Sequence, residues 1–502
     1  MQRYIKSFDS LSVTHFFLHL PIRNLHISHE NNNCTGTLKQ HFAVSAMTSD
    51  KERGHIVCDV TPCRHNLVPR HKITCFLLCL SDQLLYEVLL TVLDNMKVKD
   101  VLDTIRIKAE KENMELEGVL SSIDFGRKVK NKQIINNDRL VQLIRHFNKY
   151  RLTNDNFVFP DLLGAAYEYM IKNFADSAGK KGGEFYTPSA VVQLMVRLIK
   201  PQENMSVYDP TVGSGGMLIH SKRYVDENGG DGTRMALYGQ DDAATVWSIC
   251  KMNMIMHDVK SADIQHGDTL IEPHWHDDQN VKQFDRVLAN PPFSQNYTRN
   301  EKMQYQNRFV YGWAPQTGKK ADLMFVQHMI ASLKPDGMMV TVMPHGVLFR
   351  GGKEKEIREG ILRDKQDILY AIINLPPDLF YGTTIPTCLL VISKKEKPEK
   401  LKGKVLIINA DAEYGEGKNQ NYLRPEDTEK IVWVFDNLIE EDNYSKLVPI
   451  CDILAPENDT NLNIRRSVDN TPPQELLDSL DRLIIDPIEI DSPSQSFTRR
   501  AS

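Results

Sequence analysis

Four consecutive residues in the second half of the chain, Asn290-Pro291-Pro292-Phe293, are suited to holding a planar amine. The side-chain oxygen of Asn290 and the main-chain oxygen of Pro291 are hydrogen-bond acceptors, and the prolines fix φ so that both can point at one spot. Such preorganised dipoles stabilise the charge that develops as an amino nitrogen attacks an electrophilic carbon. Phe293 offers a flat face for stacking. The tetrad predicts an amino-group acceptor site; the alternative is a proline-rich loop with Phe293 as a core anchor.

A glycine-rich segment, Asp209-Pro-Thr-Val-Gly-Ser-Gly-Gly216, lies about 75 residues earlier. It follows a short apolar run and precedes an amphipathic segment, which predicts a strand, a tight turn and a helix. Gly213, Gly215 and Gly216 would let the backbone approach a ligand closely, because they lack a Cβ. Asp209, and the absence of Lys-Ser or Lys-Thr after the glycines, argue against a phosphate loop and favour the cationic donor S-adenosylmethionine. The alternative is an ordinary connection between a strand and a helix.

Carboxylates follow the next apolar segment, Leu237-Tyr-Gly-Gln-Asp-Asp242, about 30 residues later. A carboxylate at such a strand end suits the hydroxyl groups of a ribose. We favour Asp241 over Asp242 for this contact, although either could cap a helix instead. Asp268 could meet the adenine amino group of the donor, or it could stabilise a turn.

Six motifs together carry a family resemblance, and they are specific as an ordered set. They lie at residues 159–169, 182–188, 209–216, 290–293, 320–325 and 343–350. Over roughly residues 85–480, the chain resembles the adenine-specific DNA methylase subunit of type I restriction-modification systems. The resemblance implies methyl transfer from S-adenosylmethionine to N6 of an adenine flipped out of double-stranded DNA. It also implies a separate specificity subunit, which reads the DNA sequence, and a restriction (nuclease and translocase) subunit.

The resemblance places the Glu-Phe-Tyr-Thr-Pro segment against the donor. The residues expected to bind the donor are Glu184, Phe185, Tyr186, Thr187, Pro188, Ser189, Asp209, Thr211, Gly213, Ser214, Gly215, Gly216, Asp241 and Asp268. The residues expected to be catalytic are Asn290, Pro291, Pro292 and Phe293. We expect no metal site, because the gaps among the cysteines near the N-terminus suit a zinc site poorly.

Two other functions would use the same motifs. Enzymes that methylate the glutamine amide of release factors, or guanine in ribosomal RNA, carry a similar tetrad, but they are typically shorter and lack a counterpart of residues 184–188. A non-catalytic assembly subunit, defective in DNA engagement because of an aberrant N-terminus, is the other alternative. Cytosine N4 is a further possible target, but enzymes of that kind tend to carry Ser in place of Asn290.

The alternation of strands and helices predicts an α/β fold with a mainly parallel, doubly wound, Rossmann-like sheet in residues 156–411, as in S-adenosylmethionine-dependent methyltransferases. Its strands are expected at residues 207–208, 236–238, 286–289, 338–343, 370–374, 388–393 and 405–409. The last two are separated by a short lysine-rich stretch, which predicts an antiparallel hairpin at the edge of the sheet. Ligands of such sheets bind beyond the carboxyl ends of the strands, so donor and acceptor sites should open onto one crevice.

The ends of the chain differ from this domain. Residues 1–85 hold five of the eight cysteines without a periodic apolar pattern. We interpret this start as truncated or frame-shifted sequence; the alternative is a divergent but functional extension. Residues 86–155 have the pattern of a helical domain remnant, with amphipathic helices expected at residues 101–120 and 138–150. Residues 412–490 are expected to bind the specificity subunit, and residues 491–502 have the composition of a disordered tail.

The overall charge bears on partners. A formal net charge of −5 is unusual for a protein that binds DNA alone, because phosphate contacts demand a basic surface. The sequence therefore predicts a partner that supplies positive surface, with Lys319 and Lys320 as candidates for local phosphate contacts. No apolar run is long enough to span a membrane, and no secretory signal is recognisable, which predicts a cytoplasmic protein.

Overall fold

The computed structural model describes residues 98–471, except 122, 126, 130–131, 148–161, 179–184, 260, 301–302, 304–306, 319 and 419. The predicted segments 1–85 and 491–502, the first part of the helical region, Glu184 and Lys319 lie outside the described residues. Residue contacts divide the chain into two compact units. The first comprises Met1–Tyr186, Val212–Ile219 and Ala236–Thr269, and the second comprises Thr187–Thr211, His220–Met235 and Leu270–Ser502. The domain boundaries expected from the sequence stay a prediction.

The first unit contains helices, a short antiparallel pair of strands, β1 (Lys128–Val129) and β2 (Lys132–Gln133), and two parallel strands. Its main elements are α3 (Val98–Glu112), α4 (Asn137–Phe147), α5 (Leu162–Ala178), β4 (Ala236–Asp241), α9 (Ala244–Met256) and β5 (Ala262–His266). Leu140 and Ile144, one helical turn apart on α4, pack with Leu102 and Ile105 of α3. The amphipathic helices expected near residues 101–120 and 138–150 thus form, although the first ends at Glu112.

The second unit is built on a mixed sheet. Its strands are β3 (Ser206–Asp209), β6 (Phe284–Ala289), β7 (Leu333–Pro344), β8 (Leu369–Asn374), β9 (Thr387–Ser393), β10 (Lys404–Asn409) and β11 (Ser445–Pro449). The strand order in this unit is β11-β10-β8-β9-β7-β6-β3, and in the first unit β4 lies beside β5. β3, β6, β7, β8 and β10 run in one direction, and β9 runs against its neighbours β7 and β8. The predicted mainly parallel α/β fold and its seven strands are confirmed.

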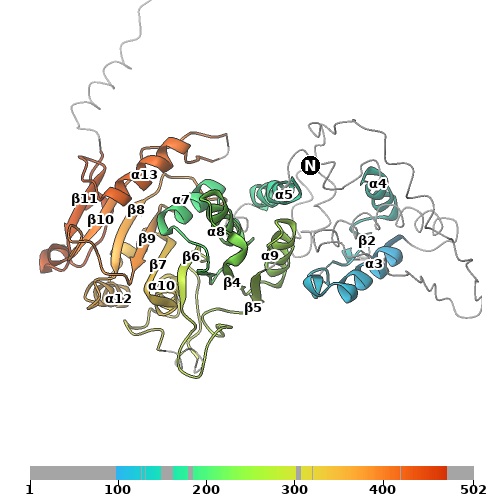
Figure 1. Cartoon of the computed structure of the whole chain (residues 1–502), viewed down its shortest axis with the longest axis horizontal. Coiled ribbons are helices and arrows are strands. Elements are labelled where there is room, and N and C mark those ends of the chain that lie inside the picture. The colour runs from blue at the N-terminus through green and yellow to red at the C-terminus, as the bar shows by residue number, and fades with distance from the viewer. Residues whose placement is uncertain are drawn as a thin grey trace, which may run out of the picture. The chain divides into compact units, whose positions relative to one another are not determined.

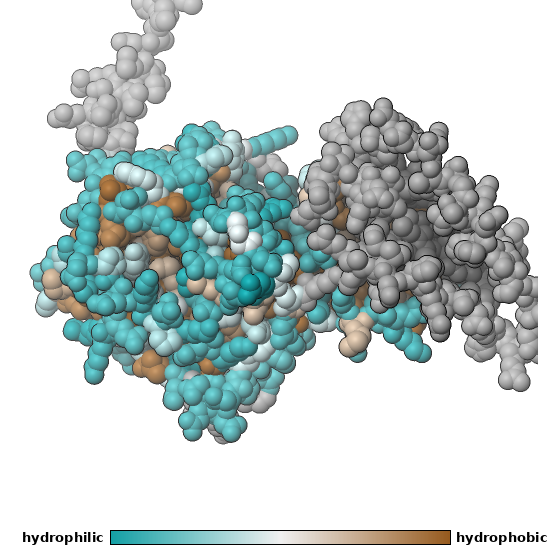
Figure 2. Space-filling model, viewed as in Figure 1, coloured by the Kyte–Doolittle hydropathy of each residue, from teal (hydrophilic) through white to brown (hydrophobic). Residues whose placement is uncertain are grey.

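Helices cover the strands of the second unit. They include α7 (Ser189–Ile199), α10 (Asp322–Ala331), α11 (Gly346–Phe349), α12 (Lys353–Leu362) and α13 (Pro425–Asn437). Figure 1 shows α7 and α13 on one side of the strands and α10 and α12 on the other. α7 follows Pro188 and ends at Lys200, which adopts a left-handed φ of 47° that stops the helix. Figure 2 shows that the visible face of these elements is mostly hydrophilic, with scattered apolar areas.

The predicted edge hairpin is wrong. β9 does not pair with β10 but lies between β7 and β8, and β10 pairs with β8 on one side and with β11 on the other. All seven residues of β9 are buried, which fits an interior strand better than an edge strand. Strands β5 and β11 were not predicted, because both are short and their alternation of apolar and polar residues is weak.

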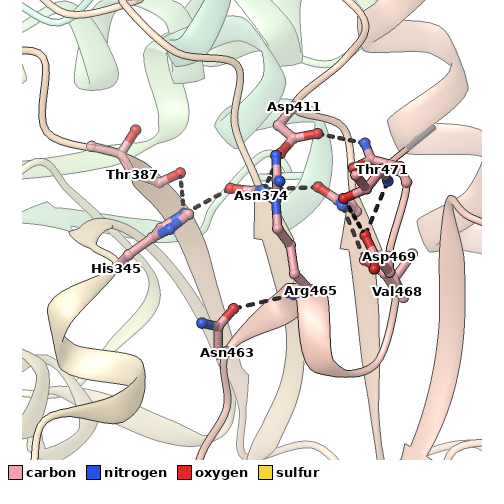
Figure 3. Close-up of polar contacts among 11 residues, drawn as sticks. His345, Asn374, Thr387, Asp411, Asn463, Arg465, Val468, Asp469 and Thr471 are labelled. Atoms are coloured by element: carbon pink, nitrogen blue, oxygen red, sulfur yellow. Dashed lines mark hydrogen bonds and ion pairs between the residues drawn. The ribbon is translucent and has the colours of Figure 1, made fainter. Parts of the chain in front are cut away.

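The chain near residue 470 contacts the carboxyl end of β10, where Asn409 Nδ2 donates to the Val468 carbonyl at 3.1 Å (Figure 3). Asn374, at the end of β8, donates to Asn409 Oδ1 (2.7 Å) and to Asp411 Oδ2 (3.1 Å). Asp411 in turn accepts hydrogen bonds from Arg465 (2.9 Å) and Asn470 (2.5 Å). These hydrogen bonds therefore hold the last described residues at the carboxyl ends of the strands, the same end of the sheet at which the tetrad follows β6.

None of the helices in the described ranges has the length and apolar character that a bilayer span requires.

Candidate active site

The tetrad directly follows β6, whose last residues are fully buried. The side-chain amide of Asn290 donates through Nδ2 to Thr187 Oγ1, at 3.0 Å. Its Oδ1 is buried and has no hydrogen-bond partner among the described residues. A buried acceptor without a partner costs free energy, which a ligand N–H would recover. The Thr187 hydroxyl therefore holds the amide with its oxygen available to an external donor, and the role of Asn290 in holding an amine stays a prediction.

Phe293 contacts a second aromatic ring that the sequence analysis missed. Its ring lies edge-on to that of Phe380, with centroids 6.0 Å apart and planes at 74°. Phe380 comes from the loop after β8, whose sequence is Asn374-Leu-Pro-Pro-Asp-Leu-Phe380. A second Pro-Pro pair followed by an aromatic residue at a strand end was the signal that could have found it.

Asp209 and Thr211 hold the beginning of the glycine-rich segment. Asp209 is buried at the end of β3, and its Oδ1 accepts the Thr211 N–H at 3.0 Å. This Asx-turn ends the strand and starts the turn. Thr211 Oγ1 is buried and, within the described ranges, has no hydrogen-bond partner. It is a second polar atom suited to an external ligand.

The glycine turn lies in the first unit, against the Glu-Phe-Tyr-Thr-Pro segment. Ser214 N–H donates to the Phe185 carbonyl at 2.9 Å. Gly213 has a φ of 53°, and a Cβ there would lie 2.8 Å from the same carbonyl oxygen. At Gly215, a Cβ would collide with the Met254 side chain. A Cβ at either glycine would thus meet other parts of the chain, and contact of these two residues with a ligand stays a prediction.

Gly216 differs from the other two glycines. It begins helix α8 (Gly216–Glu227), and a Cβ there would have no atom of the chain within 4 Å. Here the expectation of open space beside the backbone holds. The free N–H groups at the start of a helix can also face a ligand.

Three acidic residues of the first unit, Asp241, Asp242 and Asp268, lie near the glycine turn. Asp241 accepts the Gly213 N–H at Oδ2 (3.1 Å) and the Ala243 N–H at Oδ1 (3.0 Å). Burial raises the pKa of Asp241 to about 6, against the opposing effect of these two N–H groups. The Gly267 N–H donates to the Asp241 carbonyl at 2.8 Å, which places the turn before Asp268 beside it. A ribose contact from Asp241 stays a prediction.

Asp242 is exposed, unlike Asp241. Its pKa is raised first by partial burial and then by the negative charge of Asp268. The two carboxylates are therefore close enough to interact, and Asp242 remains the alternative ligand for a ribose.

Pro188 and Ser189 lie at the start of α7, and their contact with the donor stays a prediction. Pro188 caps α7, and the Ser189 hydroxyl lies 3.3 Å from His220 Nε2. The Glu-Phe-Tyr-Thr-Pro segment contacts both motifs: Phe185 bonds to the glycine turn, and Thr187 bonds to the tetrad. One crevice shared by donor and acceptor stays a prediction. No group of three or more His, Cys, Asp or Glu side chains in the described part of the chain is arranged to hold a metal ion.

A sequence model of the N-6 DNA methylases matches residues 158–475, more than half of the chain. That range contains the tetrad, the glycine turn and strands β3 to β11. The chain belongs to the N-6 DNA methylase family. The family resemblance inferred from the motifs is therefore confirmed.

Other members of the N-6 DNA methylase family are similar over most of the chain. The type I restriction enzyme MjaVII methylase subunit of Methanocaldococcus jannaschii is 36% identical over 65% of this chain. The MpnII methylase subunit of Mycoplasma pneumoniae is 30% identical over 76% of this chain and 72% of its own length. The crystal structure of a type I restriction-modification methyltransferase subunit from Streptococcus thermophilus matches with 31% identity and a TM-score of 0.65, covering 76% of this chain and 78% of that one.

The chain spans only part of some of these relatives. It covers 55% of the MjaVII subunit and 62% of the related MjaIX subunit.

Proposed function

We propose that the chain transfers a methyl group from S-adenosylmethionine to N6 of adenine in double-stranded DNA, as the modification subunit of a type I restriction-modification complex. The observation that carries this proposal is Asn290 Oδ1, a buried acceptor without a partner among the described residues, on an amide held by Thr187. Family membership and the names of the relatives give the substrate class.

Asn290 and Pro291 perform the acceptor chemistry. Their oxygens accept the two N–H bonds of the adenine amino group, which concentrates electron density on a nitrogen whose lone pair is otherwise delocalised into the ring. As positive charge develops on that nitrogen, the two dipoles stabilise it without reorganising. Thr187 keeps the Asn290 oxygen, and not the amide nitrogen, directed at the amine. Phe293 stacks on the base, and Phe380 supports its ring from the edge.

The first unit has residues that fit the donor. The open position beside Gly216 and the acidic side chains of Asp241, Asp242 and Asp268 are features that suit a cationic nucleoside. Asp241 or Asp242 would hold the ribose, and Asp268 the adenine amino group. When bound, S-adenosylmethionine supplies an electrophilic methyl group.

Partners complete the proposal. A specificity subunit would supply sequence recognition and much of the positive surface that a chain of net charge −5 lacks. A restriction subunit would share the same complex, and the complex would act in the cytoplasm. Lys320 does not offer a free charge for a phosphate contact, because it pairs with Glu354 at 2.5 Å.

Methylation of a protein glutamine or of RNA is disfavoured. The tetrad alone suits any planar amine, but the six ordered motifs and the type I relatives point to DNA adenine. A non-catalytic assembly role is disfavoured because the Asn290 amide is intact and oriented.

Replacement of Asn290 by alanine tests the proposal. We expect Asn290→Ala to lower methyl incorporation into DNA by at least about 100-fold, because it removes a transition-state acceptor. The affinity for S-adenosylmethionine should stay within a few-fold of wild type, since Asn290 contacts no donor atom in this proposal. Incorporation of a tritiated methyl group, with the cognate specificity subunit present, measures methyl transfer to DNA. Calorimetry measures the affinity for S-adenosylmethionine.

Asn280→Ala, the same change at an exposed side chain of the second unit, is the control and should leave both values unchanged. Equal loss of donor binding and turnover in Asn290→Ala would contradict the assignment. A wild-type protein that methylates glutamine peptides or RNA in preference to DNA would overturn the proposed substrate.

A further inference from the structure

Two of the motifs in the sequence, at residues 320–325 and 343–350, have no role in the site described so far. The structure brings both to the residue that follows the tetrad. Asp322, the first residue of α10, is buried, and its Oδ1 accepts the N–H of Ser294 at 2.8 Å. The carboxylate therefore holds the backbone immediately after Phe293.

Ser294 needs such support because of its backbone conformation. Its φ is 54°, a left-handed value that residues with a side chain adopt at a cost in free energy. A second hydrogen bond, from Ala321 N–H to the Gln295 carbonyl at 3.0 Å, joins the same two segments. The turn that ends the tetrad is thus clamped to the start of α10 at two successive residues.

A cluster of alternating charges orients this carboxylate. Asp322 Oδ2 lies 3.3 Å from Arg350 Nη1, which also lies 3.3 Å from Glu354 Oε1. Glu354 is buried and pairs through Oε2 with Lys320. Burial raises the pKa of Asp322, whereas the Ser294 N–H and the Arg350 guanidinium act in the opposite direction. Two acids and two bases therefore neutralise one another, and the 320–325 and 343–350 motifs each contribute to the cluster.

We propose that Asp322 is a positioning residue for the acceptor site, which acts by fixing the turn at Ser294 and so the placement of residues 290–293. Arg350 keeps the carboxylate in the orientation that receives the Ser294 N–H. This inference rests on the proposed function, because the residues it positions are those assigned to hold the adenine amino group.

Two substitutions at position 322 and one matched control test the inference. Asp322→Ala removes both acceptor oxygens, and Asp322→Asn keeps one that can still receive the Ser294 N–H. The control is Asp285→Ala: Asp285 lies on β6 near its other end, where its carboxylate likewise accepts a serine N–H, from Ser206 at 2.8 Å, and pairs with Lys334 at 2.8 Å.

We expect kcat for DNA methylation to fall about 100-fold in Asp322→Ala, since a displacement near 1 Å at a reacting group has an effect of that order. The dissociation constant for S-adenosylmethionine should change less than about twofold. Asp322→Asn should recover most of kcat, and Asp285→Ala should keep it. All rates are normalised to the folded fraction measured by circular dichroism at the assay temperature.

The inference is overturned if Asp322→Ala loses no more kcat than Asp285→Ala, or if donor affinity falls in step with kcat. Amide hydrogen exchange of the peptide covering residues 290–298 gives a second readout that needs no turnover. Faster exchange there in Asp322→Ala, but not in Asp285→Ala, supports the clamp, and equal exchange refutes it. Wild-type protein without DNA methylation would refute the proposed function alone, while the exchange result would still decide the role of Asp322.

Discussion

Single polar atoms shape the candidate active site. Thr187 Oγ1 determines which end of the Asn290 amide is left for a ligand, and one oxygen of Asp322 fixes the turn beyond Phe293. The sequence singled out Asn290 because the tetrad and the glycine-rich segment occur in this order, each at the end of a predicted strand. It gave no sign of the bond to Thr187, which comes from a residue 103 positions earlier.

Gly216 offers a residue-scale test of the donor site. We expect Gly216→Ala to stabilise the protein by about 0.5–1 kcal/mol, because a helix start with no neighbour beside the Cβ favours alanine over glycine. The affinity for S-adenosylmethionine should nevertheless fall, since the added methyl group would enter the space proposed for the donor. Urea denaturation measures the change in stability, and calorimetry measures the affinity for S-adenosylmethionine.

Gly213→Ala is the companion variant, with the opposite effect on stability. Its φ of 53° and the Phe185 carbonyl oxygen 2.8 Å from the new Cβ should destabilise the fold as well as the site.

Unchanged donor affinity in Gly216→Ala would show that the backbone at Gly216 does not face the donor.

At the scale of elements, strand positions were predictable and their neighbours were not. Each predicted strand is found, because an apolar run bounded by turn residues is a local signal. The position of β9 depends on which strands offer partners, and the short lysine-rich connection to β10 suggested a hairpin that does not form. The contact between Phe380 and Phe293 was not predictable for the same reason, because it requires the sheet to bring β8 and β6 near each other.

The network at the carboxyl ends of the strands yields a prediction about stability. Asp411→Ala should lower the free energy of unfolding by roughly 1–3 kcal/mol, because it removes an acceptor from the buried Asn374 amide and releases Arg465 and Asn470. Urea denaturation followed by circular dichroism measures this change. His345 Nε2, 2.7 Å from Asn374 Oδ1, should rearrange with it.

Asp436→Ala is the matched control for this change. Asp436 forms an exposed ion pair with Lys200, and such pairs contribute about 0–1 kcal/mol. If Asp411→Ala has no larger effect than Asp436→Ala, the C-terminal segment is not held by this network.

For the whole molecule, the charge balance implies dependence on a partner. We expect methylation of cognate DNA sites only when the specificity subunit is present, and a steep fall in activity between about 50 and 200 mM salt, because the complex gains affinity by releasing counterions from the phosphates. Methyl incorporation as a function of salt, with and without that subunit, measures both. Activity on DNA that is independent of the partner would contradict the prediction, and donor binding without turnover in the complex would favour the assembly-subunit alternative.

The sequence by itself determined the family, the α/β class, the strand positions and the residues of the tetrad and the glycine turn. All of these depend on residue types at short spacing, where local chemistry and periodicity suffice. Tertiary structure alone decided the place of β9, the free oxygen of Asn290, the ring beside Phe293 and the hold of Asp322 on Ser294. These features join residues 28 to more than 100 positions apart, and which of the many possible partners meet is settled by packing that no local pattern records.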